Sequence, residues 1–472
     1  MQTVSAAQLA DRPDKLSRKI KLGFGVGDLG GNLFFTIIGF WLLNFLTDSF
    51  GLAAGAAGTA LFIGKMWDAV TDPAVGYLSD RTYTKWGRRR PYMFVGAIFL
   101  FIFMILMFAS PNITSQPGKF AWVATIYCLL NTAYTLVNIP YSALTPELTS
   151  DFDERTTLNG YRMSFAVVGT LIGAGAFLPL VGILGGGSTG YLITGTIMGA
   201  IMALVTMITV ITVKEQLGAP VKSNVRVIRS YLQVLGLKEF LTILLPYAFH
   251  ITGITIIQAS LIYYFRYIYE QEGLFSLALL VLLVVCLALI PVWVVISKSI
   301  GKKNSYNVGM SIFLVAVVAF FFLGPGLPVW FSFVVFAVAG IGYATNYVMP
   351  YSIVPDVVEY DFAETGSRRE GVFYGMLLFS SKVGQAFALA LTGWILAAFQ
   401  YVAPPVTGEF LAQSDTAVLG IRLLTGPIPA FFFLLGIIVM SFYPISRAVY
   451  EQIMKKVEDR EKAAAAEDKP ES

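Results

Sequence analysis

Long hydrophobic runs, separated by polar or Gly/Pro-rich breaks, follow one another along the whole 472-residue chain. A helix needs roughly 20 apolar residues to cross the hydrocarbon core of a bilayer, and each run has at least that length. Because backbone groups in lipid must be hydrogen-bonded internally, we predict a helix for each run. Twelve spans are predicted: 20–47, 54–79, 91–110, 119–146, 160–184, 189–213, 238–268, 274–298, 305–325, 328–354, 372–399 and 418–444.

The composition agrees with a chain that lies mostly in lipid. Charged residues make up 13% of the sequence, against about 25% in soluble domains. The net charge of +4 is too small to suggest binding to nucleic acid, and two cysteines with one histidine give no disulfide framework or metal pattern. Neither a phosphate-binding loop nor a nucleophile–base arrangement is found. We therefore expect no enzymatic activity, no cofactor and no nucleic-acid partner.

Lysine and arginine are concentrated in three connections: 80–91, 214–237 and 298–303. Short basic connections stay on the cytoplasmic side of a membrane. Both termini are therefore predicted to be cytoplasmic, in a multi-pass protein of the cell membrane.

The predicted spans fall into two halves. The basic connection after the second span has a weak counterpart six spans later, at 298–304, and the longest internal polar stretch separates the halves. Two related six-helix halves are typical of secondary carriers. We predict an all-α membrane protein of the major facilitator fold, functional as a monomer among membrane lipids. Its predicted parts are an N-terminal tail 1–19, bundles 20–213 and 238–444, a linker 214–237 and a C-terminal tail 445–472.

Two aspartates interrupt the second hydrophobic run. Asp68 and Asp72 are four residues apart, so both side chains lie on one face of a helix. Two carboxylates in a medium of low dielectric constant repel each other unless a cation or a proton binds. Thr71 and Thr135 offer further oxygen ligands. The sequence therefore predicts a site for a coupling ion, Na⁺ or H⁺; in the alternative interpretation, Lys65 merely neutralises the acid pair.

Other charged residues have a different interpretation. Acids and bases alternate near the inner end of the tenth span and in the loop after the second, which is typical of solvated ion pairs that gate the cytoplasmic side. The residues predicted for this gate are Asp80, Arg88, Arg89, Asp356, Glu359 and Arg369. Lys382 lies within an apolar run. It either faces a cavity near the acid pair or extends to the membrane interface.

Several segments resemble the glycoside–pentoside–hexuronide:cation symporters, the relatives of the bacterial melibiose carrier. The segments are 65–73 (KMWDAVTDP), 86–91 (WGRRRP), 134–141 (YTLVNIPY) and 355–360 (PDVVEY). The resemblance implies that Asp68 and Asp72 bind the coupling ion, Na⁺ if the carrier is sodium-coupled, with Thr135 beside them. It also implies functional roles for Arg162 and Lys382.

The resemblance weakens at the sugar-contacting positions. The carrier's two sugar-binding aspartates match Gly30 and Asn138 here, with Asp28 half a turn before the first. Asp28, Asn138, Arg162 and Lys382 are accordingly expected to contact the substrate. This pattern looks more like the glucuronide and pentoside branch than like the melibiose carrier itself.

The expected function is cation-coupled symport of a sugar, glycoside or hexuronide by alternating access. The same family includes animal carriers of lysophospholipids, which the chain resembles around its tenth and eleventh spans, so a lysolipid is the alternative substrate. A receptor or sensor built on a carrier scaffold is the alternative without transport.

Overall fold

The computed structural model describes residues 16–149, 152–213, 215, 231, 233–367, 369–404 and 411–467, which are helical apart from turns and one isolated β-bridge. The first half contains α2 (Arg18–Gly25), α3 (Gly27–Ile37), α4 (Ala54–Arg81), α5 (Arg90–Phe108), α6 (Gln116–Leu148), α7 (Phe152–Gly175), α8 (Phe177–Ile183) and α9 (Gly187–Thr212). Two π-helical segments, Ile38–Leu42 and Phe45–Ser49, extend α3.

The second half contains α11 (Lys238–Tyr267), α12 (Phe275–Ile300), α13 (Lys302–Leu323), α14 (Trp330–Thr365), α15 (Glu370–Ala398), α16 (Asp415–Thr425), α17 (Pro427–Ser441) and α18 (Arg447–Glu467). Short 3₁₀ turns, Glu272–Leu274 and Gly324–Gly326, precede α12 and follow α13. A single residue, Gly301 with φ +85°, makes the turn between α12 and α13.

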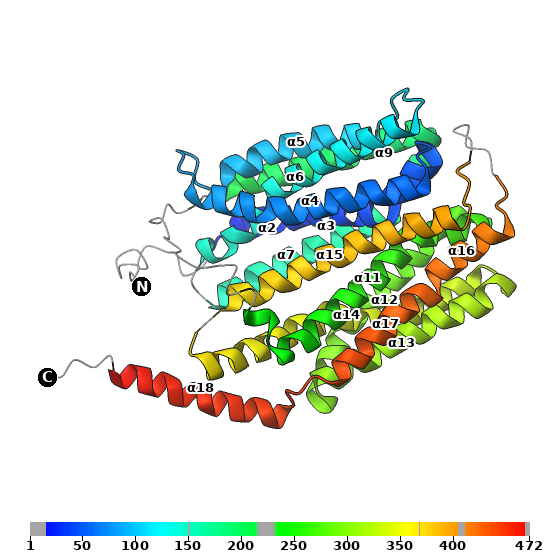
Figure 1. The fold of residues 1–472 in the computed structure, drawn as a ribbon. Helices are drawn as coiled ribbons and strands as arrows, with labels where there is room; N and C mark the ends of the chain where they lie inside the picture. Colours follow the sequence, from blue (N-terminus) through cyan, green and yellow to red (C-terminus); the bar gives the residue numbers. More distant parts are fainter. Residues whose placement is uncertain are drawn as a thin grey trace.

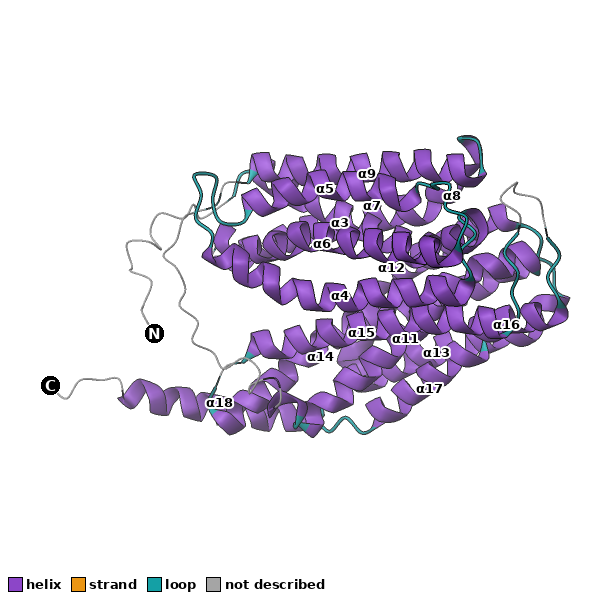
Figure 2. Cartoon of the chain, turned by 45° about the horizontal axis from the view of Figure 1, so that its top comes forward, coloured by secondary structure: helices purple, strands orange, loops and turns teal. Residues whose placement is uncertain are grey.

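The helices form two bundles that lie side by side (Figures 1 and 2). Helices α2–α9 pack among themselves, and so do α11–α17. The bundles meet chiefly where α4 packs on α15, with further contacts of α11 and α12 to the first bundle. The α4–α5 loop and α18 lie at the same end of the bundles, on the left in Figure 1. We name this the basic end, after Arg88–Arg90, and the other the opposite end.

Most of the predicted spans are helices that could cross a membrane. Ten described helical stretches are long and apolar enough, and the bent pair Thr157–Gly175 with Phe177–Ile183 makes an eleventh. The remaining predicted span, 54–79, is the 28-residue α4, which carries Lys65, Asp68 and Asp72 near its middle. The structure therefore confirms the all-helical membrane fold. The proposed linker 214–237 lies mostly outside the described residues.

Glycines at the start of the first span allow close packing and a break in the helix. A Cβ on Gly23 would lie 2.0 Å from Thr212 Oγ1, and one on Gly27 would lie 2.6 Å from the Tyr141 ring. Helix α2 ends at Gly25 and α3 begins at Gly27. The glycines therefore allow neighbouring helices to approach closely at the point where the first span is interrupted.

Candidate functional site

Asp68 and Asp72 face the same neighbours from one side of α4, as their spacing predicted. The Thr135 hydroxyl on α6 lies 2.9 Å from Asp68 Oδ1 and 3.0 Å from Asp72 Oδ1, so its single hydrogen is shared between the two acids. Thr71 is turned differently, because its hydroxyl donates to the backbone oxygen of Asp68 at 3.2 Å. Thr135, but not Thr71, therefore touches both carboxylates.

The other oxygen of each carboxylate contacts Lys382, which belongs to the opposite bundle. Its Nζ lies 2.8 Å from Asp68 Oδ2 and also contacts Asp72 Oδ2. The Asp68 side chain is 1% exposed and that of Asp72 is 21% exposed. Of the two interpretations of Lys382, the one that places it near the acid pair agrees with this geometry, and the site spans the interface between the bundles.

The same geometry bears on the alternative in which Lys65 neutralises the acids. Lys65 lies on α4, yet its Nζ has no hydrogen-bond partner among the described residues. The ammonium group that contacts both carboxylates comes instead from Lys382. No cluster of three or more histidine, cysteine or acidic side chains suited to a metal occurs in the described residues. The oxygen atoms that the structure brings together at the predicted ion site are those of the two carboxylates and of the Thr135 hydroxyl, and the role of this site in binding an ion stays a prediction.

Asp28 and Arg162, two of the predicted substrate residues, form an ion pair within the first bundle. Arg162 Nη1 donates to Thr145 Oγ1 at 3.1 Å, and its guanidinium lies 5.1 Å from the centre of the Tyr141 ring. Asn138 is half-buried on α6. The structure thus pairs Asp28 with Arg162 and sets Lys382 on the acid pair, and the role of all four in binding substrate stays a prediction.

A cavity of about 320 Å³ lies between the two bundles, lined by α3, α4 and α7 on one side and by α11, α12, α13, α14 and α15 on the other. Asp28, Asn138, Arg162 and Lys382 are not among its lining residues. Its polar lining consists of hydroxyl and amide groups with a single lysine: Asn32, Thr36, Lys65, Thr170, Tyr247, Thr255, Gln258, Tyr343, Tyr347, Tyr351, Ser381 and Gln385. Most of these residues cannot be recognised from the sequence, because neutral polar side chains do not stand out from an apolar run.

The predicted gating residues make ion pairs inside each bundle at the basic end. Arg89 contacts Asp80 at 3.1 Å, Asp356 contacts Lys302 at 2.7 Å, and Arg369 contacts Asp361. Arg89 thus pairs with Asp80, another residue of the predicted gate, whereas Asp356 and Arg369 pair with Lys302 and Asp361, which were not predicted for it. Glu359 lies three residues after Asp356 on α14. Their role as a gate remains untested.

The backbone of Arg88, Arg89 and Arg90 makes a further contact that the sequence did not suggest. The backbone N–H groups of Arg89 and Arg90 donate to Glu215 Oε1 at 2.8 and 2.6 Å, and that of Arg88 donates to Oε2. These groups open α5, where unpaired N–H groups and the helix dipole favour an anion. Glu215, which follows α9, thereby fixes the basic loop against the end of α9.

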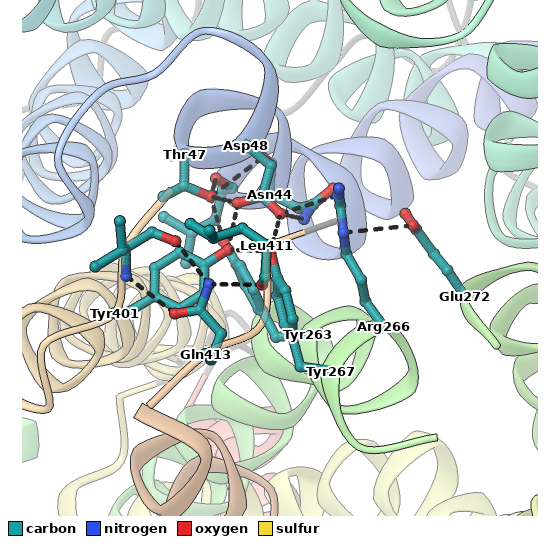
Figure 3. A network of polar contacts seen from close by, with 12 residues as sticks. Asn44, Thr47, Asp48, Tyr263, Arg266, Tyr267, Glu272, Tyr401, Leu411 and Gln413 are labelled. Carbon is teal, nitrogen blue, oxygen red and sulfur yellow. Dashed lines mark hydrogen bonds and ion pairs between the residues drawn. The ribbon is translucent and has the colours of Figure 1, made fainter. Parts of the chain in front are cut away.

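At the opposite end, a buried polar network joins the bundles (Figure 3). Asp48, 6% exposed, receives hydrogen bonds from Arg266 at 3.1 Å, from Tyr267 at 3.3 Å and from Tyr401 at 2.6 Å, all in the second bundle. Thr47 and Tyr263 add a bond of 2.7 Å between their hydroxyls. Hydrogen bonds to charged groups stabilise by about 1.5–3 kcal/mol each, so the network holds the bundles together at this end.

Three curated proteins are similar to the chain over most of their length. An uncharacterized symporter of Synechocystis sp. is 31% identical, covering 95% of this chain and 98% of that protein. An isoprimeverose transporter of Lactiplantibacillus pentosus is 30% identical, and the match covers 90% of this chain and 88% of that protein. A sodium-dependent lysophosphatidylcholine symporter of Danio rerio is 26% identical, and the match covers 97% of this chain and 91% of that protein.

A solved transporter structure and a transporter family model also match the chain. The crystal structure of the nucleoside transporter NupG matches with a TM-score of 0.63 at 12% identity, covering 91% of this chain and 99% of that one, which indicates a shared fold. The family model for MFS/sugar transport proteins matches residues 23–447. The chain therefore belongs to the glycoside–pentoside–hexuronide:cation symporters of the major facilitator superfamily.

Proposed function

We propose that the chain is a secondary active transporter, not an enzyme, that couples the entry of Na⁺ or H⁺ to the uptake of a sugar, glycoside or hexuronide. The observation that carries this proposal is the position of Lys382. It belongs to the second bundle, yet its ammonium group contacts both aspartates of the first. A cation that binds Asp68 and Asp72 competes with Lys382 and so changes a contact between the bundles.

This competition links ion binding to the conformation of the carrier. A ligand shifts a conformational equilibrium only by its differential affinity for the two states. With Lys382 on the acids, the cation site is occupied by an internal group. When a cation replaces it, the ammonium group is released at the edge of the bundle interface, and the two bundles can change their relative position around the cavity. Coupling follows if cation and substrate favour the same state, since each then raises the affinity for the other.

The sides of the membrane follow from the distribution of charge. The basic end carries Arg88–Arg90, Lys302 and α18, and basic connections remain in the cytoplasm. The Asp48 network then closes the extracellular side, and both termini lie on the cytoplasmic side of the cell membrane. In this state, release of substrate occurs toward the cytoplasm.

The function is tested by transport into proteoliposomes that contain the purified full-length chain. Labelled sugars and uronides are supplied with an inward gradient of Na⁺ or of H⁺, and the gradient is then collapsed with monensin or with a protonophore. We expect accumulation above the external concentration that disappears with one of the two ionophores. Uptake that only equilibrates, or binding without flux, contradicts symport.

Lysophosphatidylcholine provides the second candidate substrate, because one relative with 26% identity is named as its sodium-dependent symporter. The same proteoliposomes are supplied with labelled lysophosphatidylcholine, with and without excess sugar. Saturable, cation-dependent lysolipid uptake that no sugar inhibits would replace the sugar assignment.

A further inference from the structure

Among the described residues that line the central cavity, Lys65 is the only charged one, and none of them is an acid. The side chain comes from the middle of α4 and is 2% exposed. Its Nζ has no hydrogen-bond partner among the described residues, and it lies 5.1 Å from the centre of the Phe35 ring. Lys65 thus places a buried amino group at the wall of a cavity, next to one aromatic ring.

An ammonium group in this position is costly to maintain. Burial of a charge without a partner disfavours the folded state strongly, and a charged residue within a spanning helix usually faces a partner or a pathway. The acids nearest in sequence, Asp68 and Asp72, already contact Lys382 and Thr135. The two carboxylates attract Lys65 electrostatically but form no hydrogen bond with it. A hydrogen-bonding partner for Lys65 is therefore expected to come from outside the chain, through the cavity that Lys65 lines.

The charges of this region support a negatively charged partner. Asp68 and Asp72 balance Lys382 and Lys65, so the four groups together are neutral. A cation bound to the two acids, as in the proposed function on which this inference rests, leaves one positive charge in excess. A substrate with one negative charge restores neutrality, and it does so only when the cation is present.

The remainder of the cavity favours a polyhydroxylated molecule. Amide groups of Asn32, Gln258 and Gln385 can donate to and accept from hydroxyl groups, and four tyrosines, Tyr247, Tyr343, Tyr347 and Tyr351, offer both ring faces and hydroxyls. A few polar groups on a largely apolar wall are what orient a small ligand in its pocket.

We propose that the substrate of this cavity is a sugar that bears a carboxylate, and that Lys65 binds that carboxylate. A neutral sugar fills the same space and leaves the ammonium group unpaired, so discrimination between the two follows from the cost of that unpaired charge. The positive charge of the residue at position 65 thereby determines which sugars the carrier accepts.

Binding to the purified full-length protein tests this proposal. Affinities are measured by thermal stabilisation, with saturating Na⁺ and at low pH, for glucuronate, galacturonate and their methyl glycosides, each beside the neutral sugar that differs only at the carboxylate. We expect at least one acid sugar to bind at least tenfold more tightly than its neutral match. Equal affinities for every pair, or no binding by any acid sugar, overturn the proposal.

Variants at position 65 identify the residue that binds the carboxylate. Lys65→Gln is expected to lower the affinity for the acid sugar at least tenfold while the affinity for the neutral sugar changes less than twofold. Lys65→Arg, which keeps the charge, should retain most of the affinity, and Lys85→Gln is the matched control because Lys85 is exposed in the α4–α5 loop. Equal losses for both sugars contradict a role in recognising charge.

Failure of this inference is distinguishable from failure of the proposed function. If a cation gradient drives accumulation of neutral and acid sugars equally, symport stands and the role of Lys65 is wrong. If no sugar is accumulated on any gradient and only lysophosphatidylcholine binds, both are wrong.

Discussion

At the scale of single residues, the chain places one hydroxyl between two acids and one ammonium group on their other side. Thr135 touches both carboxylates from α6, and Lys382 touches both from α15. In the proposed mechanism, a cation that displaces Lys382 meets carboxylates that Thr135 already holds in position. We therefore expect the hydroxyl to contribute to cation affinity.

Replacement of Thr135 by valine tests this contribution. The change keeps the shape of the side chain and removes the hydrogen shared by Asp68 and Asp72, a charged hydrogen bond worth about 1.5–3 kcal/mol. We expect the affinity for the coupling ion to fall roughly tenfold, which corresponds to about 1.4 kcal/mol. The measurement is a titration of substrate binding against Na⁺ or pH.

The control is Thr196→Val on α9, because that hydroxyl donates only to the backbone oxygen of Leu192. The affinity for the coupling ion should fall in Thr135→Val and stay unchanged in Thr196→Val. A cation affinity that is unchanged in Thr135→Val, or lowered equally in both, would show that the hydroxyl does not organise the acid pair.

Which of these residues could be predicted depends on their surroundings in the sequence. Asp68 and Asp72 stand out because charges interrupt an apolar run, and their spacing predicts a shared face. Asp48 and Arg266 were missed because they lie near the ends of their runs, where charged residues are unremarkable. Lys65 seemed a natural partner for Asp68 three residues later, and only the tertiary structure shows that Lys382 takes that place.

At the scale of helices, α4 and α15 approach each other through small residues. A Cβ on Gly393 would lie 2.4 Å from Ala54 O, and one on Gly58 would lie 2.9 Å from Ala390 O. Close approach of this kind depends on residues without bulky side chains. Trp394 Nε1 also donates to Thr59 Oγ1 at 2.9 Å beside this crossing. The two helices are therefore in close backbone contact where they cross.

Gly393→Leu should force this crossing apart. The added side chain collides with backbone atoms of α4, which cannot rotate away, so the bundles are expected to separate at the opposite end. Spin labels at Asn112 and Gln271, exposed positions of the first and second bundle at that end, should show a longer mean distance. Gly160→Leu is the control, because nothing lies within 4 Å of a Cβ there.

An unchanged distance in Gly393→Leu, or the same change in Gly160→Leu, would contradict the view that this crossing closes the opposite end.

The positions of the helices followed from hydropathy, but their breaks did not. The first span is divided at Val26, the fifth near Ala176 and the twelfth at Gly426. Each break lies within a continuous apolar run, because neighbouring helices rather than water satisfy the local backbone. Hydropathy alone cannot locate such breaks.

At the scale of the whole molecule, the Asp48 network joins the two bundles at the opposite end. One carboxylate of the first bundle accepts hydrogen bonds from an arginine and two tyrosines of the second. Opening this end requires all of these contacts to be exchanged for water or for other partners. The network therefore favours the state in which the opposite end is shut.

Asp48→Asn should shift the carrier toward opening at this end. Removal of the charge leaves Arg266 buried with only Glu272, 3.8 Å away, and loss of one partner of a buried ion pair costs about 3–5 kcal/mol. The measurement uses a background in which Gln258 is replaced by cysteine and Cys128 and Cys286 by alanine. In this background, a membrane-impermeant maleimide added outside should label the introduced cysteine at least fivefold faster in Asp48→Asn than in the protein that keeps Asp48.

Asp415→Asn is the matched control, an exposed acid at the start of α16. It should leave the labelling rate unchanged. Slower or equal labelling in Asp48→Asn would show that the network does not hold this end closed.

The central claim, that the acid pair couples a cation gradient to uptake, is tested most directly by Asp72→Asn. This acid is the more exposed of the two, so the substitution should be tolerated, and the exposed Asp459→Asn on α18 serves as control. In proteoliposomes with an inward gradient of the coupling ion, the wild type and Asp459→Asn should accumulate substrate above its external concentration, whereas Asp72→Asn should reach equilibrium only. Accumulation by Asp72→Asn in proportion to the gradient would contradict the account.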